Sequence, residues 1–119
     1  MFTVKTTVEV SKEIIDCMLC CAFEGGSNYW ARSPDNNAKE VGAEYAFQAP
    51  LFDKGYFIIQ DMEDEDKEYK VTKAVLEKGL QIMAKDYERH FKDAVNENDD
   101  AITGDVFLQC CVFGEVIYG

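Results

Sequence analysis

The chain has 119 residues, 47% of them hydrophobic and 13% aromatic, a composition that favours one folded domain over residues 1–119 and argues against disorder. Its 23 acidic residues outnumber its 12 basic residues, and the formal net charge of −11 disfavours direct contact with nucleic acid. No apolar run approaches the roughly 20 residues of a membrane span, and the N-terminus lacks the pattern of a signal peptide. We therefore expect a cytoplasmic protein that does not contact a membrane.

The negative charge is concentrated in two stretches. Residues 61–68 hold six acids and one lysine, and residues 86–105 hold seven acids, one arginine and one lysine. Residues 69–85, between them, carry a net charge of +3. Concentrated carboxylates attract basic protein surfaces, so both stretches are candidate partner-binding surfaces. The candidate residues are Asp61, Glu63, Asp64, Glu65, Asp66, Asp86, Glu88, Asp93, Glu97, Asp99 and Asp100.

The N-terminal part predicts a strand followed by a helix. Apolar and polar residues alternate over residues 3–10, which is typical of a half-buried strand. Ser11 is a suitable N-cap, and the apolar residues after it recur at helical spacing up to Ala22. Gly25 and Gly26 are expected to end this helix, because glycine adopts the left-handed C-cap conformation at little cost.

The middle of the chain gives weaker signals. Turn-forming residues crowd residues 33–37, and six carboxylates between residues 61 and 68 favour a loop or hairpin tip at 61–66. The strongest strand signal is the apolar run within residues 55–61. The segments expected to form strands are residues 29–32, 44–48, 55–61 and 68–71.

The C-terminal part predicts helices. Thr72 can cap a helix that extends past Met83, and residues 87–95 form another. A last helix begins near Ala101 or Thr103 and is apolar on more than one side, which indicates burial or a homodimer contact. Its main apolar stripe contains Ile102, Val106, Cys110, Phe113 and Ile117. The order of elements predicts an α+β domain with an antiparallel sheet of three to four strands and three to four helices packed on it.

The five cysteines, Cys17, Cys20, Cys21, Cys110 and Cys111, form a poor disulfide framework. Buried thiols are expected instead. The alternative, a redox or metal site at the CxxC motif of Cys17 and Cys20, lacks a second CxxC or a histidine pair. The aspartates at 99, 100 and 105 do not follow EF-hand spacing and are better explained as capping the last helix. We therefore expect neither a metal nor a cofactor.

Several segments in the first and last thirds of the chain are distinctive together. They are Glu24-Gly25-Gly26-Ser27-Asn28-Tyr29-Trp30, His90-Phe91-Lys92-Asp93, Asn96-Glu97-Asn98-Asp99-Asp100-Ala101, Gly104-Asp105-Val106-Phe107-Leu108-Gln109 and Phe113-Gly114-Glu115-Val116-Ile117-Tyr118-Gly119. Residues 11–30 and 76–119 thereby resemble a family of small proteins, without an established reaction, carried by bacteriophages, prophages and plasmids. The resemblance implies a bacterial host and a mobile-element setting, in which small proteins often modulate host machinery or host defence.

A second group of residues suggests a ligand site. An amide and two aromatic rings in succession after the glycine pair suit ligand recognition, although Trp30 in the core is the simpler reading. Asp105 and Gln109 lie one turn apart on the last helix, and this polar strip could face Asn28 or Trp30, although an exposed Gln109 on the outer face of the helix is the simpler interpretation. The candidate ligand-binding residues are Asn28, Tyr29, Trp30, His90, Asp105 and Gln109.

The function that we expect is that of a non-enzymatic acidic binding protein that inhibits a host system, as an anti-CRISPR-like or other anti-defence protein. Its partner would be a basic or nucleic-acid-handling host protein, because clustered carboxylates can imitate the charge of a nucleic-acid backbone. An acidic surface that only maintains solubility is the simpler alternative. A second hypothesis is a small-molecule binder that sequesters a nucleotide immune signal. A third is a small enzyme in which a carboxylate orients His90 as general base.

Overall fold

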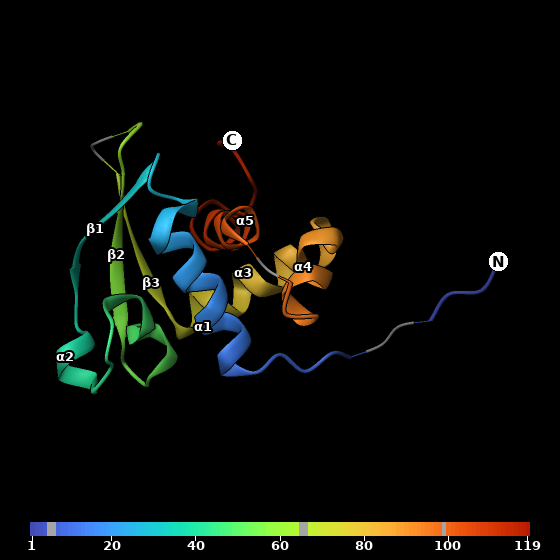
Figure 1. The fold of residues 1–119 in the computed structure, drawn as a ribbon, viewed down its shortest axis with the longest axis horizontal. Coiled ribbons are helices and arrows are strands. Elements are labelled where there is room, and N and C mark those ends of the chain that lie inside the picture. The colour runs from blue at the N-terminus through green and yellow to red at the C-terminus, as the bar shows by residue number, and fades with distance from the viewer. Residues whose placement is uncertain (5–6, 65–66, 99) are drawn as a thin grey trace.

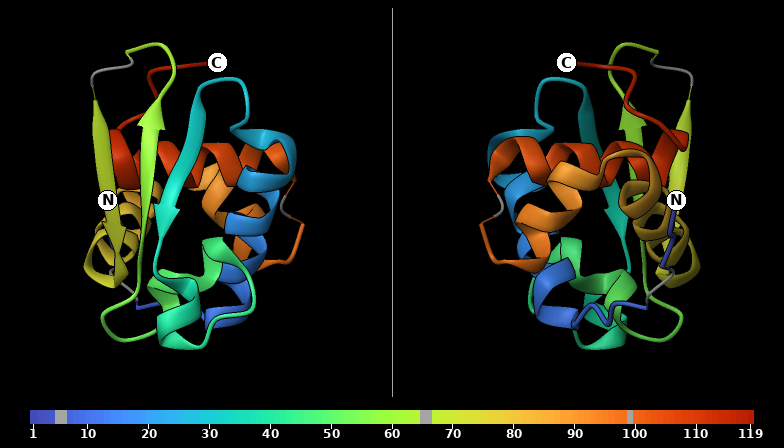
Figure 2. Two further views of the ribbon diagram at one scale, coloured as in Figure 1. Left: turned by 90° about the vertical axis from the view of Figure 1, so that its left-hand side faces the viewer. Right: turned by 90° about the vertical axis from the view of Figure 1, so that its right-hand side faces the viewer.

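The fold consists of a three-stranded sheet with helices on one of its faces (Figures 1 and 2). The computed structural model describes residues 1–4, 7–64, 67–98 and 100–119. The strands are β1 (Ala31–Asn36), β2 (Tyr56–Asp61) and β3 (Glu68–Thr72), and both pairings, β1 with β2 and β2 with β3, are antiparallel. The predicted α+β class is confirmed.

Three longer helices contribute to the core, and the other helical segments are shorter. The helices are α1 (Lys12–Cys21), which continues into a π-helical turn η1 (Ala22–Gly26), α2 (Ala38–Val41), the 3-10 turn η2 (Ala46–Leu51), α3 (Lys73–Asp86), α4 (Glu88–Val95) and α5 (Ala101–Phe113). The predicted caps are present: Ser11 Oγ accepts from the Ile14 amide at 3.3 Å, and Thr72 Oγ1 accepts from the Val75 amide at 3.4 Å.

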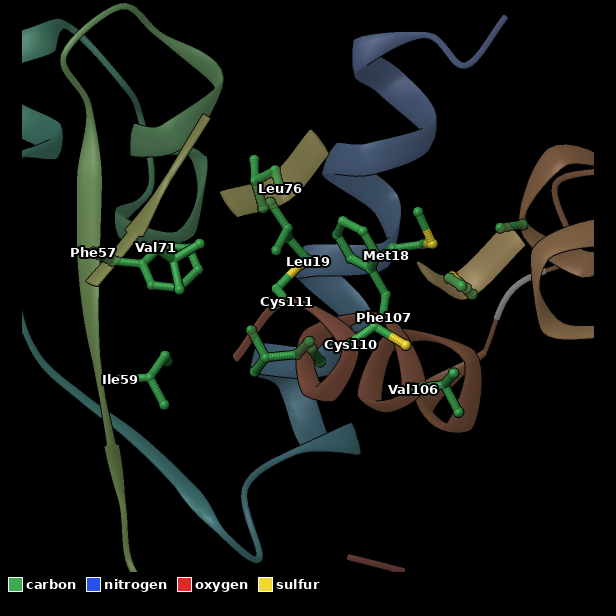
Figure 3. Close-up of a cluster of buried hydrophobic side chains, with 14 of the residues drawn as sticks. Met18, Leu19, Phe57, Ile59, Val71, Leu76, Val106, Phe107, Cys110 and Cys111 are labelled. Carbon is green, nitrogen blue, oxygen red and sulfur yellow. The ribbon is translucent and has the colours of Figure 1, made fainter. Parts of the chain in front are cut away.

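Helix α5 lies at the centre of the domain, packed against α1 on one side and α3 on the other. Nine of its thirteen residues are buried, so its apolar character on several sides is explained by burial within one chain. Figure 3 shows Phe57 and Ile59 of β2 pointing from the sheet towards the helices, where Leu19 of α1 and Phe107 of α5 lie. The sheet and the helices thus share one core.

Two glycines let the central helices approach closely. A Cβ atom on Gly79 of α3 would lie 2.8 Å from Cα of Cys111, and one on Gly104 of α5 would lie 2.6 Å from the carbonyl oxygen of Met18. Both distances are far below van der Waals contact. Glycine is therefore required for the contacts of α5 with α3 and α1.

The strand predicted at residues 3–10 is wrong. In the described parts of this segment, residues 3–4 and 7–10, the backbone forms no regular structure, and residues 1–4 lie away from the sheet and the helices (Figure 1). A strand needs a neighbouring strand to pair its backbone groups, and alternation alone does not provide one. Residues 5 and 6 lie outside the described residues.

Three other boundaries differ from the sequence-based expectation. Residues 46–51 form the turn η2 in place of a strand at 44–48. Strand β1 runs through the turn formers to Asn36, with an irregular register between Arg32 and Asp35 where Pro34 lacks a backbone donor. Helix α5 ends at Phe113, because Gly114 takes the left-handed conformation with φ of 77°, so Ile117 falls outside the helix.

No helix within the described ranges is long and apolar enough to cross a membrane.

Candidate functional site

A buried carboxylate joins α5 to the loop that follows η1. Asp105 is only 8% exposed. Its Oδ1 accepts hydrogen bonds from Ser27 Oγ at 2.8 Å and Trp30 Nε1 at 2.7 Å, and its Oδ2 accepts from Tyr29 Oη at 2.6 Å and Gln109 Nε2 at 3.0 Å. These are four neutral donors around one carboxylate.

Gln109 extends this network to the segment after α5. Its Nε2 also donates to the carbonyl oxygen of Tyr118 at 3.1 Å, and its Oε1 accepts from the amides of Ile117 and Tyr118, both at 2.9 Å. The side chain is fully buried. The prediction that Asp105 and Gln109 form a polar strip facing Trp30 is therefore confirmed, and the strip also binds residues 117–118.

Further contacts fix the C-terminal segment, residues 114–119. The Tyr118 hydroxyl donates to Asp61 Oδ2 at 2.8 Å, and the Val116 amide donates to the hydroxyl of Tyr87 at 2.8 Å. The Trp30 ring packs against those of Phe113 and Tyr118, with centroids 5.0 and 5.8 Å away. The C-terminal segment is thus tied to the sheet, to the loop after η1 and to the start of α4.

The chemistry of Asp105 is that of a structural anchor. A carboxylate offers about four lone-pair directions, and all four are occupied by protein donors. The same contact affects Tyr29, whose pKa is raised to about 12 by burial and by its hydrogen bond to Asp105. Because these groups already satisfy one another, Asp105, Gln109 and the polar ends of Trp30 and Tyr29 hold the fold together rather than a ligand.

A groove of about 850 Å³ lies beside this anchor. It is bounded by the loop after η1, the first turns of α5, the C-terminal segment and one residue of α4. The residues that line it are Gly25, Gly26, Tyr29, His90, Ala101, Ile102, Asp105, Val106, Val116, Ile117, Tyr118 and Gly119. The groove thus brings Tyr29, His90 and Asp105 together, with Trp30 and Gln109 behind its wall.

Asn28 does not join this groove. It is exposed and lines a smaller cavity of about 220 Å³ on the other side of the same loop, together with Ser33 and Ile59. The prediction that it shares a site with Tyr29 and His90 is therefore wrong. Consecutive residues in a tight turn point in different directions, which explains the separation.

His90 lies on α4 and contributes its imidazole to the groove. Its Nδ1 is buried and has no hydrogen-bond partner within the described chain. A general base needs a group that orients its ring, and no described carboxylate hydrogen-bonds this imidazole. The hypothesis of an enzyme built on His90 therefore stays a prediction.

The groove lacks features that bind phosphate. Among the described residues that line it there is neither a lysine nor an arginine. The N-terminus of α5, which could otherwise receive an anion, is occupied by Asp100, whose Oδ1 accepts from the Thr103 amide at 2.9 Å. That backbone hydrogen bond is the main cause of the lowered pKa of Asp100. The described lining thus offers a phosphate neither a lysine nor an arginine.

The acidic residues divide into different environments. Asp61 is only 2% exposed and accepts hydrogen bonds from Tyr118 and the Glu63 amide, so its prediction as a partner-binding residue is wrong. Asp61 lies on the face of β2 that packs against the core, so its side chain is buried and bonds within the fold.

The other acidic residues lie in two places. Glu63 and Asp64 lie at the β2–β3 hairpin tip, whereas Asp86, Glu88, Asp93, Glu97 and Asp100 lie on or beside α4. Glu65, Asp66 and Asp99 lie outside the described residues.

The cysteines differ in exposure. Cys110 and Cys111 are buried as expected, and burial raises the pKa of Cys110 to about 12 and that of Cys111 well above its usual value. Cys17 is exposed, which corrects the expectation of a buried thiol. No disulfide forms among the five.

Two members of the anchor were missed from the sequence. Ser27 and Tyr118 carry no motif, and their roles depend on contacts 78 and 57 positions away in the chain. The one available signal was proximity in sequence, since Ser27 precedes the aromatic pair.

Comparisons with protein-family models, curated proteins and solved structures gave no match.

Proposed function

We propose that this protein is a non-enzymatic acidic binding protein whose binding surface surrounds α4. The observation that carries the proposal is the set of carboxylates that α4 and its flanks expose to solvent: Asp86, Glu88, Glu97 and Asp100 are all exposed. In the described part of the chain the one ion pair joins Lys67 and Asp64 in the hairpin, so the α4 carboxylates keep their charge available to a partner.

The α4 surface is a better candidate than the hairpin tip. At the tip, Asp61 is buried and Asp64 lies 3.3 Å from the ammonium of Lys67, which lowers the free charge. The hairpin tip and α4 also lie on opposite sides of the domain, so one rigid surface of a partner would not contact both (Figure 1). We therefore assign the binding role to the surface around α4.

A basic partner follows from this charge. Exposed carboxylates on a short, fixed helix attract a lysine- and arginine-rich surface and speed association at low salt. Such a helix can occupy a channel that otherwise holds a nucleic-acid backbone. Together with the resemblance to mobile-element proteins, this supports an inhibitor of a host system, such as a nucleic-acid-guided defence nuclease.

The test is affinity purification from host lysate followed by charge reversal. Wild-type protein is expected to recover a basic or nucleic-acid-handling protein, and the complex should weaken steeply as salt rises. The triple variant Asp86→Lys, Glu88→Lys, Glu97→Lys should lose at least about ten-fold in affinity. The hairpin variant Glu63→Lys, Asp64→Lys is the matched control and should bind as wild type. Recovery of no basic partner, or equal loss in both variants, would overturn the proposal.

A second candidate function is small-molecule binding, and the groove is the observation that favours it. A volume of about 850 Å³ lies within the usual range for ligand sites. The absence of lysine and arginine from its described lining argues against the nucleotide immune signal considered from the sequence.

A further inference from the structure

The walls of the groove are already fixed before any ligand arrives. Tyr29 is held by its 2.6 Å hydrogen bond to Asp105, and residues 117–118 are held by Gln109. On the opposite side Gly26 packs so closely on the Ala101 carbonyl that a Cβ atom there would collide with it. A site with preformed walls binds without the entropic cost of ordering them.

The groove exposes apolar surface that the chain does not cover. Ile102 is 63% exposed, and Tyr29 is 48% exposed although its hydroxyl is bonded inward. Ile117 is also exposed and lines the same groove. Exposed aliphatic groups around an exposed aromatic ring favour a flat, largely apolar molecule.

The charged groups around the groove favour some of these molecules over others. Neither lysine nor arginine is among the described lining residues, whereas the carboxylate of Asp105 lies in the wall and that of Asp100 caps the adjoining helix end. A negatively charged ligand would be repelled by both, because charges are poorly screened beside a partly enclosed surface. Neutral and positively charged molecules meet no such barrier.

His90 supplies the directed polar contact. Its Nδ1 is the one buried side-chain nitrogen or oxygen without a hydrogen-bond partner in the described residues. An unpaired buried polar atom costs free energy that a ligand can recover. A ligand in the groove can reach this nitrogen only if the ring rotates about the Cβ–Cγ bond, a soft torsion in histidine.

We propose that the groove beside Asp105 binds a flat aromatic molecule that is neutral or positively charged, with His90 making the directed hydrogen bond to the edge of its ring. This inference rests on the second candidate function and is independent of the α4 carboxylates. It names the ligand class by shape, charge and one polar contact.

Calorimetric titration of the full chain with two matched pairs of probes tests it. The first pair is adenine and AMP, which differ by the ribose phosphate, and the second is benzamidine and benzoate, which have the same shape and opposite charge. Adenine and benzamidine should bind at least about ten-fold more tightly than their anionic counterparts. Trp30 lies directly behind Tyr29, so its fluorescence should change on binding.

Variants locate the binding. Ile102→Trp fills the groove from an exposed position and should abolish binding of both probes, whereas Phe52→Trp, at an exposed position outside the groove, should not. His90→Phe keeps a ring without nitrogens and should weaken adenine several-fold, with partial rescue by His90→Gln. Binding of AMP or benzoate in preference would overturn the ligand class. Failure of all four probes, or binding that survives Ile102→Trp, would overturn the site and the second candidate function with it.

Discussion

The side chain of Gln109 hydrogen-bonds both backbone groups of Tyr118, donating to the carbonyl oxygen at 3.1 Å and accepting from the amide nitrogen at 2.9 Å. The Gln109 side chain thus bonds backbone groups of the irregular C-terminal segment, as the backbone of a neighbouring strand would do in a sheet. The same amide reaches Asp105 and Tyr29, so one side chain connects the C-terminal segment to the buried carboxylate.

Replacing Gln109 with leucine should therefore destabilise the protein strongly. Leucine has a similar volume but no hydrogen-bonding groups, and the change leaves two backbone amides, one carbonyl and Asp105 short of a partner. We expect a loss of about 2–4 kcal/mol in the free energy of unfolding, measured by urea denaturation. The exposed Gln81→Leu on α3 is the control and should change it by less than about 0.5 kcal/mol. Equal effects in the two variants would show that the amide contributes nothing.

Two tyrosines should make the protein sensitive to strongly alkaline pH. The pKa of Tyr118 is raised from 10.0 to about 12 by its hydrogen bond to Asp61, and the pKa of Tyr29 rises to a similar value. A phenol whose folded pKa is raised stabilises the fold below its unfolded pKa and ceases to do so as pH rises through the folded value. Stability should thus fall between about pH 10 and 12.

Absorbance titration at about 295 nm, where phenolate absorbs, and urea denaturation at several pH values measure this effect. Tyr118→Phe should remove one late-titrating phenol and flatten the fall in stability over that range. If the phenol lost in Tyr118→Phe is one that titrates near pH 10, as an ordinary tyrosine does, the assignment to its contact with Asp61 is contradicted.

Gly79→Ala should destabilise the protein although alanine is the better helix former. Alanine gains about 1 kcal/mol in helix propensity, but its Cβ would meet the Cα of Cys111 at 2.8 Å, so α3 and α5 must separate. We expect a net loss of about 1–3 kcal/mol in thermal or urea unfolding. Lys78→Ala, on the exposed side of α3, is the control and should be neutral or slightly stabilising. A stabilised Gly79→Ala protein would mean that the two helices are not in close contact.

The cysteines should react in an order set by exposure and pKa. The thiolate is the reactive form, so raised pKa values slow Cys110 and Cys111 in the folded protein. A thiol reagent at about pH 8 should modify Cys17 first and the two α5 cysteines only on unfolding, as peptide mass analysis would show. Cys17→Ser should remove the fastest phase. Early modification of Cys110 would contradict its burial.

Local sequence signals predicted the elements that depend on local physics. The hydroxyls of Ser11 and Thr72 lie close in sequence to the amides that they cap. The apolar run before Asp61 forms a strand, as its residue types favour. The alternation of residues 3–10 was misleading, because it records a preference of side chains and cannot specify a pairing partner. At residues 46–51 the chain forms a 3-10 turn that contains Pro50, a residue poorly suited to a strand interior.

The candidate site was predictable to the extent that it lies on one helix. Asp105 and Gln109 are one turn apart, so helical geometry alone places them together. Their meeting with Trp30 was a correct inference from the same offset, but the saturation of Asp105 by four donors was not visible, since Ser27 and Tyr29 are 78 and 76 positions away. The groove likewise needs tertiary contacts, because its walls come from four separate parts of the chain.

The Asp105 anchor has a consequence for how the chain is made. Ser27, Tyr29 and Trp30 leave the ribosome well before their acceptor does, because Asp105 follows them by 75 to 78 residues. Until α5 has been synthesised, the loop around them has no buried partner for its polar groups, and the β-hairpin and α1 lack the helix against which they pack. Non-local pairing of this kind slows folding. The nascent chain is therefore expected to stay open until α5 has been synthesised, with apolar surface exposed to chaperones at the ribosome.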